Sequence, residues 1–302
     1  MIVARIDKST KKCIMQHKVI LMEEAKKSYT FGAYVWFGYM LPFKEKLDAI
    51  KRAGFDNICL WWDDNVINCD GSLAEQIAIA YKFDLHVEHA HIPYYDCNKL
   101  WKDCIDGVDL MNMCIKSVEL AYCLNVPTLV MHPFELKKPV DGSTKIFMER
   151  FKKITQVCAN KEIRFAVENL ADNDCLKSIL RSNNDNPYVG LCFDSGHNNI
   201  VSKDFSLLTE FSKKVFALHL HDNDSISDSH LLPFEGNVNW KVFIKALKNT
   251  SFTGSLMLEA CFPFDYSKLD TENSEKIMLP DIPMDEYLLK AYDSLKKLSS
   301  FV

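Results

Sequence analysis

The sequence predicts an α/β protein built as a single (β/α)₈ TIM barrel, in which eight parallel strands alternate with eight helices. Two observations predict this fold. From residue 31 onward, eight short apolar runs, near-continuous as in buried parallel strands, alternate with eight amphipathic stretches of helical periodicity. The 302 residues also fit one barrel, and no linker divides them. An open doubly wound sheet is the alternative, although the phosphate-binding patterns GxGxxG and GxxxxGKS/T are absent.

The elements follow one another in the order that a barrel requires. The expected strands occupy residues 31–39, 57–64, 85–94, 128–135, 164–170, 189–197, 215–222 and 254–260. The expected helices, with apolar residues at i, i+3, i+4 and i+7, occupy residues 43–55, 72–83, 109–125, 144–161, 174–184, 204–214, 239–250 and 285–300. Gly54 is expected just after the first helix, because this position often adopts a left-handed conformation. Residues 1–30 have no counterpart in the repeat, so we expect an N-terminal extension followed by one barrel domain over residues 31–302.

The composition limits the classes of protein to consider. The net charge is −5 and the isoelectric point is near 6.0, so we expect no nucleic-acid partner. No apolar run reaches the roughly 18 residues that span a membrane, and no secretory signal is evident. Eleven cysteines without a CxxC pair favour a cytoplasmic protein with free thiols. Five of them lie in apolar stretches and are expected to be buried: Cys59, Cys114, Cys123, Cys192 and Cys261.

Four acidic or imidazole residues stand at the ends of four predicted strands: Glu168, Asp194, His219 and Glu259. Each gap between them is about one strand–loop–helix–loop unit, so a barrel would bring all four to one end. A carboxylate in such an apolar setting is costly to bury without a cation, and no arginine stands at a strand end. Carboxylate and imidazole groups together are typical ligands of a divalent metal ion. The sequence therefore predicts a metalloenzyme, with a purely structural, metal-free histidine cluster as the alternative.

Further polar residues fall at the same predicted end of the barrel. They are candidates for substrate binding or for additional metal ions: His91, His132, His197, Asp228 and His230. His89 and His221 lie two residues from His91 and His219, and therefore on the same faces of their strands. We expect one histidine of each pair to support the site from behind. Nearby aromatic residues are expected either to wall a sugar pocket or to pack in the core: Trp36, Phe37, Trp61, Trp62, Tyr94, Phe193 and Phe262.

With these residues identified, the chain resembles the xylose-isomerase-like TIM-barrel superfamily. The resemblance covers about residues 30–300 and rests on the stretches HAHIPY, VMHPFE, AVENL, FDSGH, LHLHDND, DSHLLPFEGNVNW and MLEA. This group includes sugar isomerases and epimerases, inosose dehydratases, hydroxypyruvate isomerases and trinuclear-zinc apurinic endonucleases. By position, Glu168, Asp194, His219 and Glu259 match the single-metal site of the epimerases. The resemblance therefore implies a metal-dependent isomerase or epimerase of a sugar, sugar phosphate or inosose.

We expect Glu168 and Glu259 to be the catalytic pair, one removing a proton beside the substrate carbonyl and the other returning it. Mn²⁺ is the expected ion because oxygen ligands predominate, with Zn²⁺, Co²⁺ and Mg²⁺ as alternatives. The expected partner is a small carbohydrate, and we expect no nucleic-acid or membrane partner. The resemblance also implies self-association, because barrels of this family often form oligomers. Dehydration of the substrate is a further reaction open to the same chemistry.

Two departures from the family patterns bear on the alternatives. No arginine follows His219 closely, unlike in the ketose 3-epimerases, since this loop reads HDNDSISDSH. The segment HPFELKKPVDG also lacks the glycine-rich character of the repair enzymes. A trinuclear-zinc apurinic endonuclease nevertheless remains an alternative, because ligand candidates for it are present. A non-catalytic sugar-binding barrel is the other.

Overall fold

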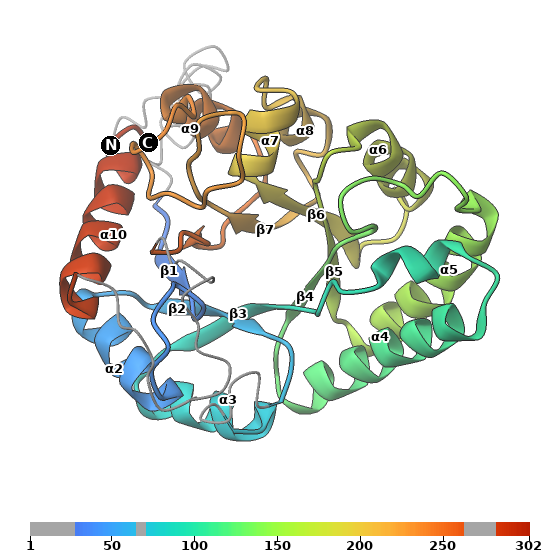
Figure 1. Cartoon of the computed structure of the whole chain (residues 1–302), viewed down its shortest axis with the longest axis horizontal. Coiled ribbons are helices and arrows are strands. Elements are labelled where there is room, and N and C mark those ends of the chain that lie inside the picture. The colour runs from blue at the N-terminus through green and yellow to red at the C-terminus, as the bar shows by residue number, and fades with distance from the viewer. Residues whose placement is uncertain (1–27, 65–70, 263–281) are drawn as a thin grey trace, which may run out of the picture.

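The computed structural model describes residues 28–64, 71–262 and 282–302, which form a (β/α)₈ barrel as predicted (Figure 1). Its strands are β1 (Phe31–Tyr34), β2 (Asn57–Trp61), β3 (His86–His91), β4 (Thr128–Met131), β5 (Arg164–Glu168), β6 (Val189–Asp194), β7 (Val215–His219) and β8 (Leu256–Leu258). Neighbouring strands pair in parallel in the order β7-β6-β5-β4-β3-β2-β1-β8. Backbone bonds from Leu220 N to Met257 O (2.9 Å) and from Glu259 N to Leu220 O (3.0 Å) join the two ends of this sheet. The expected N-terminal extension lies almost wholly outside the described residues and stays a prediction.

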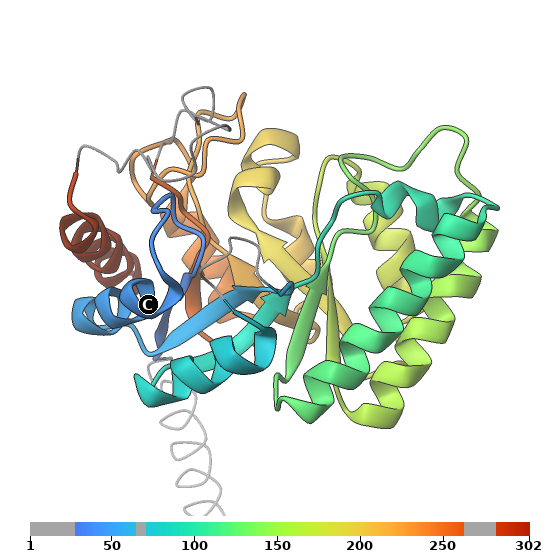
Figure 2. The same cartoon turned by 60° about the horizontal axis from the view of Figure 1, so that its bottom comes forward.

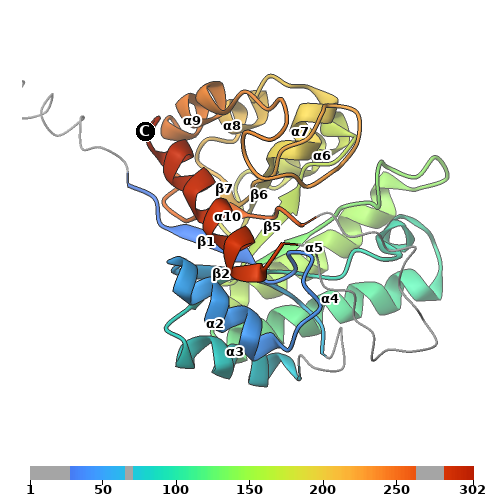
Figure 3. The same cartoon turned by 60° about the vertical axis from the view of Figure 1, so that its left-hand side comes forward.

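The helices cover the outside of the barrel. They are α2 (Phe43–Ala53), α3 (Leu73–Lys82), α4 (Ile105–Cys123), α5 (Thr144–Lys161), α6 (Asn173–Ser182), α7 (Ser195–Val201), α8 (Ser206–Glu210), α9 (Trp240–Lys248) and α10 (Met284–Ser299), with a 3₁₀ helix η1 (Cys97–Trp101). Helices α4 and α5 run side by side along the barrel wall (Figure 2). Helix α10 lies against α2 (Figure 3), and an ion pair from Arg52 Nη2 to Asp285 Oδ1 (2.7 Å) joins them. Among the described helices, none is both long and apolar enough to cross a membrane.

Local sequence signals explain where several helices begin and end. The Ser72 side chain accepts a hydrogen bond from Glu75 N, and the Glu75 carboxylate accepts one from Ser72 N, which forms a capping box at the start of α3. The Asp172 side chain accepts a hydrogen bond from Cys175 N and thereby caps the start of α6. Gly54 ends α2 with φ 104°, so the expected left-handed position is confirmed. The first two caps fix where α3 and α6 begin, and Gly54 directs the chain from α2 toward β2.

The structure differs from the predicted elements mainly where strands reach the carboxyl end of the barrel. The strand expected over residues 31–39 ends at Tyr34, and the chain then turns through Gly38, whose φ is 92°. The strand expected to reach His197 ends at Asp194. The Asp194 side chain accepts a hydrogen bond from His197 N (2.6 Å) and thereby starts α7 at once. Polar residues that look like strand ends therefore belong to caps and loops around the site.

The core has an outer and an inner part, and the inner part leaves room for a site. The outer faces of the strands pack against the helices in one large apolar cluster. Inside the barrel, small residues fill one half: Val130, Ala166, Cys192 and Ala217. Tyr34, Cys59, Trp61 and Met257 fill the other half. Small side chains in β4 to β7 thus leave space for the polar groups above them.

The predicted burial is confirmed for three of the five cysteines. The nine cysteines in the described part of the chain are free thiols, and Cys59, Cys114 and Cys192 are buried as expected. Cys261 is half-buried, whereas Cys123 is exposed, so its predicted burial was wrong. Cys123 lies two residues beyond buried Ala121, which turns it about 200° around the axis of α4 and away from the sheet.

Candidate metal centre

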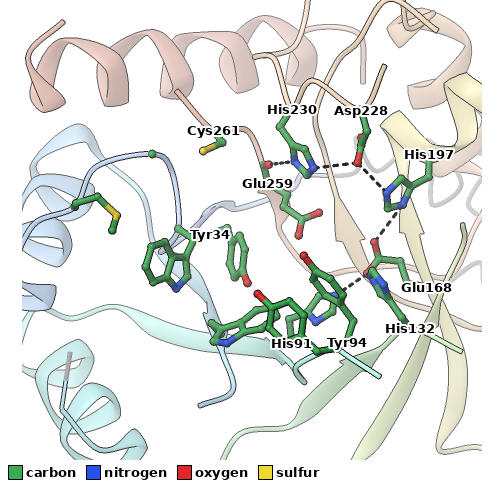
Figure 4. Close-up of a pocket in the computed structure, with 15 residues that line it drawn as sticks. Tyr34, His91, Tyr94, His132, Glu168, His197, Asp228, His230, Glu259 and Cys261 are labelled. Atoms are coloured by element: carbon green, nitrogen blue, oxygen red, sulfur yellow. Dashed lines mark hydrogen bonds and ion pairs between the residues drawn. The ribbon is translucent and has the colours of Figure 1, made fainter. Parts of the chain in front are cut away.

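All nine predicted site residues gather at the carboxyl end of the barrel. They come from β3 to β6, the start of α7, β7, the loop after β7 and the residue after β8. Most of them line a cavity of about 410 Å³ that opens at this end (Figure 4). The cavity is lined by Tyr34, Trp36, Gly38, Met40, Trp61, His91, Tyr94, Tyr95, His132, Glu168, His197, Asp228, His230, Glu259 and Cys261.

The four residues of the predicted metal set converge at the base of this cavity. One side-chain ligand atom from each of Glu168, Asp194, His219 and Glu259 lies within 4.8 Å of the others. His219 Nδ1 is 3.1 Å from Glu168 Oε2 and 3.1 Å from Glu259 Oε2. Glu168, Asp194 and His219 are buried, and only Glu259 is partly open to solvent. Three carboxylates and one imidazole therefore share a space of the size that one divalent ion occupies.

Glu168 also belongs to a second group of ligand atoms. Its Oε2 lies 3.1 Å from His91 Nε2 and 3.5 Å from His132 Nε2, and its Oε1 lies 3.4 Å from His197 Nδ1. One side-chain ligand atom from each of Glu168, His91 and His132 likewise lies within 4.8 Å of the other two. The Glu168 carboxylate thus contacts His91, His132 and His197 as well as His219, so it belongs to both groups.

A third group forms at the rim, around Asp228 in the loop after β7. Asp228 Oδ2 lies 3.3 Å from His197 Nε2 and 3.3 Å from His230 Nε2. Figure 4 shows the chain of contacts that runs from His230 through Asp228 and His197 to Glu168. The structure therefore brings together the five additional candidates as well as the four in the predicted metal set.

The tautomers of the histidines indicate that these groups suit a cation. His91 Nδ1 lies 2.7 Å from the Ile92 carbonyl oxygen, and His230 Nδ1 lies 2.7 Å from the Glu259 carbonyl oxygen. Because a carbonyl only accepts, each Nδ1 carries a proton there, and the Nε2 atom on the other side of the ring faces a carboxylate. A ring nitrogen and a carboxylate oxygen 3.1–3.3 Å apart need a proton or a metal ion between them. A ring N–H bonded to a carbonyl behind the ligating nitrogen is also usual in metal sites.

His219 provides a second, independent indication that the site fits a metal ion. Its Nδ1 is buried and lies beside two carboxylates, yet it has no hydrogen bond of good geometry to any described residue. An orphaned nitrogen in such a place is uncommon in a folded protein. The donor set present here, oxygen-rich around His219 and imidazole-rich around His91, therefore fits a divalent metal ion.

Without a metal ion, protonated histidines and ionised carboxylates attract one another across the site. Burial raises the pKa of Glu259, but the attraction of His219 outweighs burial and brings the pKa to about 2. Burial lowers the pKa of His230, whereas its contacts with Asp228 and Glu259 raise the pKa to about 9. Burial likewise opposes a charge on His219, but neighbouring Cys192, Glu259 and Glu168 raise its pKa well above the usual value. Protons thus occupy the places where we infer a metal ion.

Asn169 and Ser195 position the ligands from behind, and sequence reasoning gave them no specific role. Asn169 Nδ2 donates to Asp194 O (2.9 Å), while Asn169 Oδ1 accepts from Asp194 N (2.8 Å). The Ser195 hydroxyl contacts both the backbone N–H and the carbonyl of His221. Gly196 is required here because an added Cβ would lie 1.9 Å from the His221 ring. These contacts hold the end of β6 against the ends of both β5 and β7.

Tyr34 is one of the cavity residues that sequence reasoning missed, together with Gly38, Met40, Tyr95 and Cys261. It reads as one aromatic among several in FGAYVWFGY, and only its place at the very end of β1 signals a role. Its side chain points into the cavity (Figure 4). Burial, followed by Cys59 and Glu259, raises the pKa of Tyr34 well above its usual value, so its hydroxyl stays a hydrogen-bond donor.

The aromatic candidates divide between the two expected roles. Trp36, Trp61 and Tyr94 line the cavity, and Trp61 stacks on the His91 ring at 5.5 Å between centroids. The other four pack into the large apolar cluster: Phe37, Trp62, Phe193 and Phe262. Sequence alone does not separate them because wall and core residues alternate within the same short runs.

Comparisons with known proteins agree with this architecture. The chain is 29% identical over 165 residues to an uncharacterized protein of Sinorhizobium fredii, covering 51% of this chain and 52% of that protein. It is 25% identical over 177 residues to a protein of Mycoplasma mycoides named probable endonuclease 4, covering 50% and 58%. The chain thus spans little more than half the length of these curated relatives. The crystal structure of a D-tagatose 3-epimerase-like protein superposes with a TM-score of 0.69 at 18% identity, covering 90% of this chain and 98% of that one.

The sequence profile of one family covers most of the chain. Residues 47–275 match the profile described as xylose isomerase-like TIM barrel. The matched region contains all nine residues around the cavity and both buried ends of β6 and β7. The resemblance expected from the sequence is thereby confirmed: this chain belongs to the xylose isomerase-like TIM-barrel family.

Proposed function

We propose that this chain is a metal-dependent isomerase or epimerase of a small carbohydrate. One observation carries the proposal: Glu168 and Glu259 enter the base of the same cavity from β5 and from the end of β8, and both reach His219 Nδ1 at 3.1 Å. Two carboxylates that share a metal-ligand set can remove and return a proton on one bound substrate. The epimerase-like fold is compatible with this chemistry.

The proposed reaction is proton transfer at a carbon next to a carbonyl group. One glutamate takes the proton from that carbon, and the C–H electron pair enters an enediolate of the substrate. The other glutamate gives a proton back. Return to the same carbon on its other face gives an epimer, and return to the neighbouring carbon gives the aldose–ketose isomer. A bound divalent cation would supply Lewis-acid stabilisation of the negative oxygen.

The cavity favours a small substrate with a polar ring. Its volume of about 410 Å³ lies in the range of small-molecule pockets. Trp36, Trp61 and Tyr94 offer apolar ring faces, and the Tyr34 hydroxyl offers a donor. No lysine or arginine is among the described lining residues. These features support a neutral polyol or sugar as the substrate. Any phosphate group on it would have to bind the metal ions, because the lining offers no lysine or arginine.

The metal would be held by Glu168, Asp194, His219 and Glu259. Mn²⁺ is our first choice because three of these four ligands are carboxylates, while Zn²⁺, Co²⁺ and Mg²⁺ are alternatives. The groups around His91 and Asp228 would bind either substrate hydroxyls or further ions. We place the activity in the cytoplasm. Self-association stays a prediction that no contact between chains tests here.

A screen for hydrogen exchange with solvent tests the proposal. The metal-loaded protein is incubated in D₂O with ketoses, aldoses and inososes, and deuterium incorporation is followed by NMR. At least one sugar should gain deuterium next to its carbonyl, and Glu168→Gln should lose this exchange. Absence of exchange with every sugar that binds would instead favour a non-catalytic sugar-binding barrel.

A second function, phosphoester cleavage, is favoured by one specific observation. Nine potential ligands form three adjoining groups, which is more than a single-metal epimerase needs. A matching relative is also named probable endonuclease 4. Against a polynucleotide substrate, the stretch between β7 and α9 carries Asp222, Asp224, Asp228 and Glu235 but no lysine or arginine. A small phosphodiester would fit this candidate better than DNA.

The two functions separate on metal content and substrate. About three zinc ions per chain, together with hydrolysis of bis(p-nitrophenyl) phosphate or of an abasic oligonucleotide, would establish phosphoester cleavage. One ion per chain with deuterium exchange into a sugar would establish the isomerase. The abasic oligonucleotide and the small diester further distinguish a repair enzyme from a small-molecule phosphodiesterase.

A further inference from the structure

His89 occupies a buried position directly behind the His219 ring. It lies on β3 with none of its surface exposed, and its Nε2 is 3.2 Å from His219 Nε2. The two rings are nearly parallel, with centroids 5.3 Å apart. His89 does not line the cavity, so it would not touch substrate. Its contact with His219 is therefore the feature to explain.

The direction of the hydrogen bond follows from the other side of His219. When a metal ion is bound, His219 Nδ1 must offer its lone pair to the carboxylate side, so the ring proton resides on Nε2. His219 Nε2–H then donates, and His89 Nε2 is the acceptor at 3.2 Å. His89 then keeps its own proton on Nδ1, which lies 3.9 Å from Glu88 Oε1.

The surroundings of His89 suit this accepting role. His89 is fully buried, and no described carboxylate lies within hydrogen-bond distance of its ring, so the surroundings suit an uncharged imidazole. The Glu88 carboxylate beside it is held in place by the Ser255 backbone N–H and hydroxyl. His89 Nδ1 has no hydrogen-bond partner among the described residues, so close packing and the contact with His219 hold the ring and its Nε2 atom in place.

We propose that His89 is a positioning residue that selects the His219 tautomer. It thereby directs the His219 Nδ1 lone pair into the space among the carboxylates of Glu168, Asp194 and Glu259, where the metal ion would bind. This inference rests on the metal binding in the proposed function and adds a named supporting residue to it. Outer partners that orient a ligating histidine typically change metal affinity by about 10–100-fold when removed. The same size of effect is expected here.

A matched pair of substitutions tests the role. Glutamine can place a carbonyl oxygen near the position of His89 Nε2, whereas leucine has a similar size and no acceptor. Zinc affinity is measured by competition with a chromophoric chelator on the full-length protein. His89→Leu should weaken zinc binding by about 10–100-fold, and His89→Gln should stay close to wild type. The control is His86→Leu, because His86 is exposed at the start of the same strand.

The outcomes separate this inference from the proposed function. A wild type that binds no zinc would overturn the metal-dependent function itself. Wild-type binding with equal affinity in His89→Leu would overturn the role of His89 alone. A direct readout on the zinc-loaded wild type covers the case in which the leucine variant does not fold. Long-range ¹H–¹⁵N NMR of labelled histidines should show the His219 proton on Nε2, and a proton on Nδ1 would refute the inference.

Discussion

Asp222 and Glu168 are both buried carboxylates at the carboxyl end of the barrel, and their partners differ. Asp222 accepts four hydrogen bonds from Asn223 N, Phe234 N, Val238 N and the Trp240 indole N–H, at 2.8–2.9 Å. Glu168 meets only histidine nitrogens among the described residues. A carboxylate saturated by N–H donors is stable without an ion. A carboxylate faced by imidazoles needs a proton or a metal ion between the two groups, so this difference supports the proposed role of Glu168 as a metal ligand and a structural role for Asp222.

The largest effect is expected from Glu168→Gln. This change removes both a metal ligand and one proton-transfer group, so turnover should fall by about 10²–10⁴-fold or more. The circular dichroism spectrum should stay native, because Gln keeps the size of the side chain. The proposed chemistry fails if Glu168→Gln retains wild-type turnover on a substrate found in the exchange screen.

The opposite response is expected from Asp222→Asn. The amide places N–H groups against backbone and indole donors, which breaks a buried charge-assisted network and should cost about 3 kcal/mol of the free energy of unfolding. Urea denaturation in the presence of a chelator measures the loss. Asp103→Asn, at an exposed position, is the control and should change little. Equal stability of Asp222→Asn and wild type would show that the two acids do not differ as described.

Metal addition should stabilise the folded protein by linkage. An ion that binds only the folded state at 100 times its Kd adds about 2.7 kcal/mol. Differential scanning calorimetry with and without Mn²⁺ or Zn²⁺ should therefore raise the Tm of wild type. The rise should persist in Asp222→Asn, provided that it folds, and vanish in Glu168→Gln. A similar rise in both variants would contradict the comparison.

The same cluster predicts opposite pH dependences for the metal-free and metal-loaded protein. The pKa of His230 is raised to about 9, and a raised histidine pKa contributes stability that is complete below the unfolded value of about 6.5. This contribution is lost as the pH rises through about 9, so the metal-free protein should weaken over this window. Metal binding displaces these protons, so affinity should rise over the same window. Calorimetry in buffers of different ionisation enthalpy would detect the released protons, and a pH-independent affinity would argue against the assignment.

The smallest effect concerns Tyr34. Tyr34→Phe keeps the ring that packs with Cys59, Trp61 and Met257 and removes only the hydroxyl. If the hydroxyl donates to a substrate oxygen, kcat/KM should fall by about tenfold while metal affinity is unchanged. A loss of metal affinity in Tyr34→Phe would instead place Tyr34 in the ligand shell.

Much of the architecture could be predicted because strand burial and strand-end polarity are visible in one sequence. Runs such as RFAVENL and VFALHLHD carry polar residues toward their carboxyl ends, so parallel topology alone brings Glu168 and His219 together. The start of α7 could not be predicted, because Asp194 is both a strand end and a helix cap. The role of Asp222 depends on the loop returning through Phe234 and Trp240, which no local pattern encodes. The role of Tyr34 could not be predicted because its sequence neighbours in FGAYVWFGY are also aromatic.

Anomalous diffraction from crystals grown with manganese or zinc tests the central claim most directly. The account predicts a peak, at the absorption edge of the added metal, between the side chains of Glu168, Asp194, His219 and Glu259. Additional peaks beside His91 and beside Asp228 would indicate the multinuclear form. An empty space with the four side chains hydrogen-bonded only to protein and water, at metal concentrations that saturate related sites, would contradict the claim.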